Sequence, residues 1–264
     1  MAGRRRKFIH PNANTKMKLR YLYILVFILL AAIGCEKDSN RSVAATGKGG
    51  STARFTISGV HLYVVDGDEL HTFSLQNPAE PEQVNSLQLG WNNSIETIFP
   101  WKDKLFIGST DAMYVISISN PRQPVVEGTA SHIRACDPVV ADDKYAYVTV
   151  RTGNNCSGDI NALYVYDVSA GAGSPSRVFS QDMNNPHGLG LHNNYLYVCD
   201  GAAGLDVFNV QDGANPRLVT TKKGYTFFDC IPVDNVLVCM IEGGMVLYDI
   251  STPANPVVLS EIKK

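Results

Sequence analysis

The sequence predicts an all-β protein, and three observations carry that prediction. One two-strand phrase recurs five times along the 264 residues, about every 40 to 50 positions. Its strands are dense in β-branched and aromatic residues, and turns rich in Asp and Gly separate them, such as Asp66-Gly67-Asp68. No segment between Thr52 and Lys264 keeps a helical period. The chain is therefore expected to consist of stacked or radially arranged β units.

Each copy of the phrase has a first strand with an aliphatic-aromatic-aliphatic triplet, a turn, a second strand and an exit containing Pro. The triplets are Leu62-Tyr63-Val64, Leu105-Phe106-Ile107, Ala146-Tyr147-Val148, Leu196-Tyr197-Val198 and Leu237-Val238-Cys239. The second strands begin at Leu70, Met113, Leu163, Leu205 and Met245. One such unit cannot bury both faces of its sheet alone, so neighbouring copies must cover each other.

A β-propeller accommodates such units, because each of its blades is a four-stranded sheet packed face to face on its neighbours. Five units of about 42 residues fill the range 53–264. We therefore predict a propeller of five four-stranded blades; an open β-solenoid, or a propeller completed by a partner, is the alternative. The last unit has apolar residues on both faces of 245–250, as a sheet held between two others requires. For the second unit we predict strands at Ile95 to Trp101, Lys104 to Ser109, Met113 to Ser119 and Val125 to Thr129.

The N-terminal part differs in kind from the repeats. An apolar stretch of about fourteen residues, 21–34, follows basic residues and is too short to span a bilayer. We predict a signal peptide at 1–34, with Met17 as an alternative start. The segment 35–52 is polar and rich in small residues, which predicts a flexible tether.

The end of the signal, Ala32-Ile33-Gly34-Cys35, resembles the bacterial lipobox. This resemblance implies that Cys35 carries a diacylglyceryl group and becomes the mature N-terminus. An ordinary secretory signal or an uncleaved anchor is the alternative. Residues 1–34 hold seven Lys and Arg but no Asp or Glu, so the mature chain has a net charge of about −9. That charge argues against nucleic acid and against a basic membrane contact, and leaves the acyl chains to anchor the protein.

The repeated phrases resemble a known family over the whole range 53–264. Leu196-Tyr197-Val198-Cys199-Asp200-Gly201 and Tyr248-Asp249-Ile250-Ser251 are similar to the LVIVD repeat. The resemblance implies an exported bacterial β-propeller, often a lipoprotein of Bacteroidetes, in the cell envelope at the outer membrane, facing either the periplasm or the outside. It supplies no catalytic residues and no cofactor.

Five cysteines remain beside Cys35, in a compartment where disulfides persist. We predict a disulfide between Cys136 and Cys156, because strand entrances and second turns share one face of a propeller. The same rule allows a bond between Cys199 and Cys230. Cys239 replaces an aliphatic residue and is expected to be a buried free thiol. No spacing typical of a zinc site is present, so we predict no metal site.

Alignment of the copies brings several polar residues to the entrances of the innermost strands. These candidate ligand-binding residues are Glu96 (or Thr97), Asp137, His187 and Asp229, with His132 and Arg134 on the approaching loops. Such a ring suits a cation or a polyhydroxylated ligand, or supplies a general acid and base. The alternative is that these side chains meet water and cap loop backbone. Known hydrolase, protease, nucleotide and calcium motifs are missing, so we assign no catalytic residue.

Three functions fit these observations. The first is a non-catalytic, lipid-anchored envelope module that binds or scaffolds a protein or glycan partner. The second is a carbohydrate- or lactone-processing enzyme at the channel mouth, by analogy of fold alone. The third is a purely structural envelope protein.

Overall fold

The computed structural model describes residues 50, 52–90, 95–110, 112–131, 138–152, 160–169 and 175–263. All of them belong to one compact unit, 44–264. The predictions for Cys35, His132, Arg134, Cys136, Asp137 and Cys156 lie outside the described residues. None of the described residues belongs to a helix that could cross a membrane.

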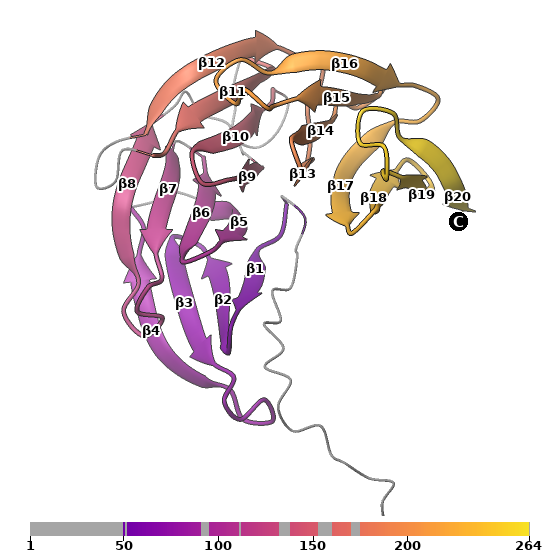
Figure 1. The fold of residues 1–264 in the computed structure, drawn as a ribbon. Coiled ribbons are helices and arrows are strands. Elements are labelled where there is room, and N and C mark those ends of the chain that lie inside the picture. Colours follow the sequence, from indigo (N-terminus) through magenta and orange to yellow (C-terminus); the bar gives the residue numbers. More distant parts are fainter. Residues whose placement is uncertain are drawn as a thin grey trace, which may run out of the picture. The chain divides into compact units, whose positions relative to one another are not determined.

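The described residues form twenty strands in five antiparallel sheets, each made of four strands consecutive in sequence (Figure 1). The first sheet contains β1 (Phe55–Ser58), β2 (His61–Asp66), β3 (Glu69–Ser74) and β4 (Glu82–Gln88). The second contains β5 (Ile95–Trp101), β6 (Lys104–Ser109), β7 (Ala112–Ser117) and β8 (Val125–Ser131). The third contains β9 (Val139–Ala141), β10 (Tyr145–Val150), β11 (Ala162–Asp167) and β12 (Ser176–Asp182).

The last two sheets repeat the same order. The fourth contains β13 (Leu189–His192), β14 (Tyr195–Cys199), β15 (Leu205–Asn209) and β16 (Arg217–Lys222). The fifth contains β17 (Phe227–Val233), β18 (Val236–Ile241), β19 (Gly244–Asp249) and β20 (Val257–Lys263). The predicted five four-stranded blades are confirmed, and in the second blade β5 and β6 have the predicted bounds. The predicted ends of β7 and β8 differ by no more than two residues.

The repeat is visible in the local geometry of every blade. In three of them the loop between the first two strands opens on a non-glycine residue with positive φ, at Lys102, Asn193 and Asp234. The ladder between the third and fourth strands shifts register at one equivalent place in all five blades, such as Val207/Phe208 and Leu247/Tyr248. This bulge adds twist and bends the outer strand. The recurring second strand of the phrase thus encodes a bulged hairpin as well as a hydrophobic run.

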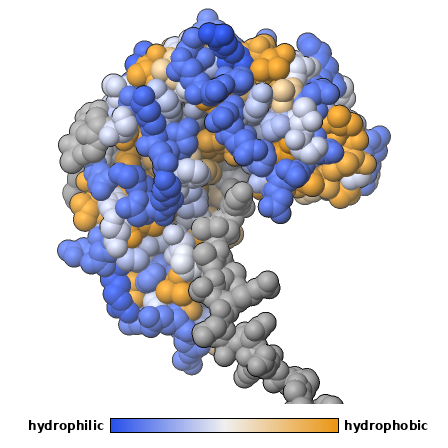
Figure 2. Space-filling model, viewed as in Figure 1, coloured by the Kyte–Doolittle hydropathy of each residue, from blue (hydrophilic) through white to orange (hydrophobic). Residues whose placement is uncertain are grey.

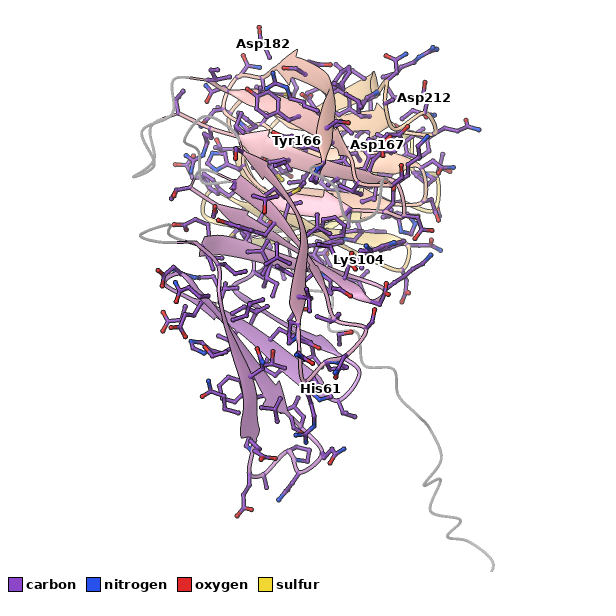
Figure 3. All side chains as sticks on the ribbon, turned by 90° about the vertical axis from the view of Figure 1, so that its left-hand side faces the viewer. His61, Lys104, Tyr166, Asp167, Asp182 and Asp212 are labelled. Atoms are coloured by element: carbon purple, nitrogen blue, oxygen red, sulfur yellow. The ribbon has the colours of Figure 1, made fainter. Side chains whose placement is uncertain are left out.

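The core lies between blades and is divided into four clusters. They join the first blade to the second, the second to the third, the third to the fourth, and the fourth to the fifth. His61, Lys104 and Asp167 mark the first three blades, which follow one another up the molecule in Figure 3. Each blade therefore has an onward face, turned to the next blade in sequence, and a backward face, turned to the previous one.

The middle residue of each triplet lies on the onward face. Tyr63, Phe106, Tyr147 and Tyr197 are fully buried there against the next blade. The Tyr197 hydroxyl donates a hydrogen bond to the Pro253 carbonyl of the fifth blade, 3.0 Å away. In the fifth blade the equivalent residue is Val238, which is only half-buried.

Among the described residues no core cluster joins the fifth blade to the first. The onward face of the fifth blade leaves Met240, Met245 and Ile262 exposed by 47%, 44% and 57%. On the backward face of the first blade, Phe55 is 60% exposed and Leu62 is half-buried. The expectation that 245–250 is covered on both sides is therefore wrong, since one side of that strand has no neighbouring blade.

Candidate functional site at the channel mouth

His187 lies where the third, fourth and fifth blades meet. Its backbone N–H donates to the Cys199 carbonyl at 2.7 Å, and its own carbonyl accepts the Thr149 hydroxyl at 2.6 Å. The imidazole meets the Phe228 ring edge to face, with the ring centroids 5.3 Å apart. Contacts from three blades thus hold the backbone of His187, and the Phe228 ring packs against its side chain.

Burial lowers the pKa of His187 to about 4, and the nearby positive charge of Arg151 acts in the same direction. The Asp200 carboxylate opposes this shift but does not cancel it. At neutral pH the imidazole is therefore uncharged, with one nitrogen as donor and the other as acceptor.

Asp229 is a buried carboxylate that links the fifth blade to the segment before the first blade. It accepts a hydrogen bond from the Thr52 hydroxyl at 2.6 Å and one from the Cys230 backbone N–H at 2.9 Å. A Cβ added at Gly50 or Gly188 would collide with its carboxylate oxygens. The close approach of these two glycines explains why no side chain fits at either position. Asp229 thus connects the innermost strand of the fifth blade, β17, to the segment that precedes the first blade.

A small cavity of about 70 Å³ lies beside these residues. It is lined by Thr52, Pro138, Arg151, Pro186, His187, Gly188 and Phe228. Arg151 follows directly after β10 and is half-buried, which lowers the pKa of its guanidinium. No described residue forms a hydrogen bond or ion pair with that guanidinium. A half-buried cation is disfavoured where no opposite charge pairs with it, and no described residue in the cavity lining supplies one for Arg151.

The structure thus brings together two of the predicted candidate residues, because Asp229 contacts Gly188, the neighbour of His187. Glu96 is half-buried on β5 and its neighbour Thr97 is buried. The described contacts do not link Glu96 to the cavity, whose lining excludes it. Whether this ring binds a ligand stays a prediction.

Two residues of the site were not found by alignment of the copies. Thr52 is the last residue of the predicted tether, yet its hydroxyl donates a hydrogen bond to Asp229, which lies 177 positions later in the sequence. Arg151 comes just after the second strand of the third copy. Equivalent positions elsewhere, such as Gly67 and Gly201, serve turns. In the sequence, Arg151 differs from the other copies only in being a basic residue at a position where they have turn residues.

Asp200 and Asp206 are carboxylates near the site that have structural roles. Asp200 is almost fully buried and accepts bonds from the backbone N–H groups of Asn184 and Asn185, at 3.1 and 2.6 Å, and from the Asn184 side chain at 2.8 Å. With Asp182 and Asp206 it lines an open cavity of about 240 Å³. Asp206 accepts the Thr221 hydroxyl at 2.5 Å, while burial raises its pKa. These acids are held by internal donors.

Three cysteines lie in the cluster between the fourth and fifth blades. Cys199, Cys230 and Cys239 are buried free thiols, as predicted for Cys239. Burial raises the pKa of Cys199, and the neighbouring Cys199 thiol together with burial raises the pKa of Cys230, whose thiol donates to the Tyr197 carbonyl at 3.6 Å. The two thiols are therefore neighbours, and their predicted oxidation to a disulfide stays a prediction. Within the described ranges, no group of three or more His, Cys, Asp or Glu side chains could hold a metal ion.

Comparison with known sequences assigns the repeat. The LVIVD repeat matches residues 188–222, the range that contains β13 to β16. The fourth blade therefore matches the LVIVD repeat. The other four blades share its bulged hairpin between the third and fourth strands. No protein with a curated description matches the chain in sequence.

Many solved β-propellers share the fold at low sequence identity. A Bacteroides fragilis protein described as a candidate 6-phosphogluconolactonase is 11% identical, with a TM-score of 0.61 over 79% of this chain and 69% of that one. BamB from Moraxella catarrhalis is 9% identical, with a TM-score of 0.57 over 72% of this chain and 54% of that one. A chain of the nidogen–laminin complex is 14% identical, with a TM-score of 0.52 over 78% and 76%.

These similarities establish the fold alone. This chain spans about half of the length of BamB and about two thirds of that of the Bacteroides protein. Its five blades therefore match only part of each of these longer chains.

Proposed function

We propose that this protein is a non-catalytic, lipid-anchored module of the bacterial cell envelope whose open fifth blade binds a protein partner. The observation that carries this proposal is the uncovered onward face of β17–β20. Every other onward face in the described structure is covered by the next blade. Figure 2 shows apolar surface gathered at the side where Figure 1 places β18 to β20.

The composition of this face favours a protein as its partner. Met240, Met245 and Ile262 are consecutive cross-strand partners, so their side chains form one row. Val238 and Leu247 form the neighbouring pair. Contiguous exposed apolar surface typically marks a protein interface, and Met is enriched at such sites. A glycan would need more polar donors and acceptors than this row offers.

One similar structure supports the same conclusion at the level of the fold. The matched chain there is part of the nidogen–laminin complex, so a propeller of this architecture takes part in a protein complex. The low identity transfers no residue and no partner to this protein.

The lipid anchor rests on Cys35 and the apolar stretch before it. Replacing Cys35 by Ser removes the sulfur that would carry the acyl chains. We expect the wild-type protein to partition into the detergent phase and Cys35→Ser to stay in the aqueous phase. Equal partition of the two proteins would contradict lipidation at Cys35.

The enzyme hypothesis has weaker support. Asp229 and Asp200 are engaged by internal hydrogen bonds, which leaves neither as a ready acid or base. His187 is a candidate base, but among the described residues no carboxylate forms a hydrogen bond that would orient its ring. Similarity to the candidate lactonase extends to fold only. The purely structural hypothesis gives no reason for an exposed row of methionines.

The test is site-specific crosslinking in cells that incorporate photo-methionine. We expect Met240 or Met245 to crosslink to a peptide of one other envelope protein. The double variant Met240→Lys/Met245→Lys should lose that crosslink and the associated co-purification.

The matched control changes Leu218 and Val219 to Lys. These residues of β16 are 50% and 47% exposed but lie on the outermost strand of the fourth blade. Their variant should retain the partner. A crosslink to residues 55–73 of the same molecule would show that the ring closes on itself. A crosslink to a second copy would show self-association. Either result would replace the proposal of a separate partner.

A further inference from the structure

The cavity beside His187 has the features of a binding site for a negatively charged group. Its walls combine one guanidinium with a neutral imidazole and with the apolar surfaces of Phe228 and two prolines; Thr52 and Gly188 complete the lining. This combination is independent of the apolar face on the fifth blade and is not explained by partner binding there.

The charge balance of the cavity is decisive. Arg151 is half-buried, and among the described residues no side chain forms an ion pair with it. A charge-assisted hydrogen bond to a bound anion would supply the missing counter-charge. Because Arg has a planar fork of donors, it binds carboxylate or phosphate oxygens through two parallel bonds.

The nearby acids do not fill this role. Asp229 accepts bonds from Thr52 and from the Cys230 backbone, and Asp200 accepts them from Asn184 and Asn185. Neither acid lines the cavity. Both carboxylates nevertheless lie near lining residues, Asp200 near His187 and Asp229 against Gly188, and their negative charges lower the net positive charge of the region. A singly charged anion fits this balance better than a phosphate dianion.

Size and wall chemistry narrow the ligand further. A cavity of about 70 Å³ holds a group of only a few heavy atoms. Pro138, Pro186 and Phe228 offer apolar contact to the carbon that bears such a group. His187 adds one ring N–H as a neutral donor.

We infer that this cavity binds a single carboxylate group, with the Arg151 guanidinium as its counter-charge and the His187 ring as a second donor. The group is the end of a larger molecule whose remainder lies outside the cavity. Two sources share this chemistry, a sugar acid and the free C-terminus of a peptide.

The test is an NMR titration of the full chain, in detergent, with labelled histidine. Sodium acetate is added at constant ionic strength, and loss of a signal in His187→Gln identifies the His187 resonance. We expect a saturable shift of that resonance. Because a charged hydrogen bond is lost, Arg151→Gln should weaken binding by about 10-fold or more.

Arg217→Gln is the matched control, since Arg217 is exposed on β16, the outermost strand of the fourth blade, and does not line the cavity. It should leave the acetate affinity unchanged. Arg151→Lys keeps the charge but loses the fork, and should weaken binding by less than Arg151→Gln. Unchanged resonances of the other histidines show that each variant is folded. Equal affinity in wild type and Arg151→Gln would overturn the inference, as would tighter binding of phosphate than of acetate.

The two sources are separated with glucuronate and with a short peptide tested as free acid and as amide. Tighter binding of glucuronate than of acetate supports a sugar acid. Tighter binding of the free-acid peptide than of its amide supports a chain terminus. If neither ligand binds more tightly than acetate, the inference of a larger carboxylate ligand is wrong.

Discussion

The fourth and fifth blades carry the same phrase in opposite surroundings. On the onward face of the fourth blade, Tyr197, Cys199 and Leu205 are completely buried by the fifth blade. The equivalent residues of the fifth blade are Val238, Met240 and Met245, and the two methionines are almost half exposed. The backward faces of both blades are covered in the same way.

This difference shows which residues of the repeat depend on the presence of a following blade. Residues shared by both blades form the hairpin and its bulge, which need no neighbour. The aromatic residue at the middle of the triplet is present where a blade follows and is replaced by Val where none does. The residues of the onward face therefore differ according to whether another blade covers them. The residues of the backward face and of the turns are similar in both blades because they form the blade itself.

The largest expected effect comes from the aromatic residue itself. Tyr197→Ala removes a fully buried ring and its hydrogen bond to the Pro253 carbonyl. We expect a loss of about 3 to 5 kcal/mol in the free energy of unfolding. Val238→Ala, at the same position of the fifth blade, should lose only about 1 kcal/mol. Urea unfolding of the two variants measures both values, and equal losses would mean that both onward faces are covered.

The next effect tests the junction between Gly188 and Asp229. Gly188→Ala places a Cβ against the Asp229 carboxylate and close to its Cα, so the clash cannot be relieved by rotation of the side chain alone. We expect a loss of about 1 to 3 kcal/mol. Asp229→Ala alone loses the bond to Thr52, but in the double variant it makes room for the new methyl group. The double variant should therefore be more stable than the sum of the single losses predicts, and strict additivity would contradict the contact.

A smaller effect follows from the pKa of His187. That pKa is about 4 in the folded protein and near 6.5 in the unfolded chain, so between these values the unfolded state binds more protons. Stability is then complete above about pH 6.5 and falls as the pH is lowered towards 4. After allowance for the solvent that reaches this half-buried ring, the loss is about 1 kcal/mol. His187→Gln should flatten this part of the pH profile, and an unchanged profile would show that the ring is not buried.

Much of the fold follows from sequence because the signals are local. Strand bounds such as those of β5 and β6 follow from β-branched runs between turns, and the blade count follows from the period. Closure of the ring could not be predicted in this way. The residues 245–250 are apolar on both faces whether or not a blade covers the second face.

The site was predicted less well, because its residues meet only through the tertiary structure. Alignment of the copies found His187 and Asp229 at equivalent positions. It gave no reason to join Thr52 to Asp229, since Thr52 precedes the first copy. Arg151 was missed because the alignment compares strand entrances, and this residue follows the end of a strand.

The most direct test of the open fifth blade is the stability of Met240→Lys/Met245→Lys in the purified chain. Lysine at exposed positions changes the free energy of unfolding by about 0.5 kcal/mol or less. We therefore expect an unfolding midpoint close to that of the wild-type protein. A loss of several kcal/mol would mean that two charges had been buried, and that the fifth blade is covered by the first.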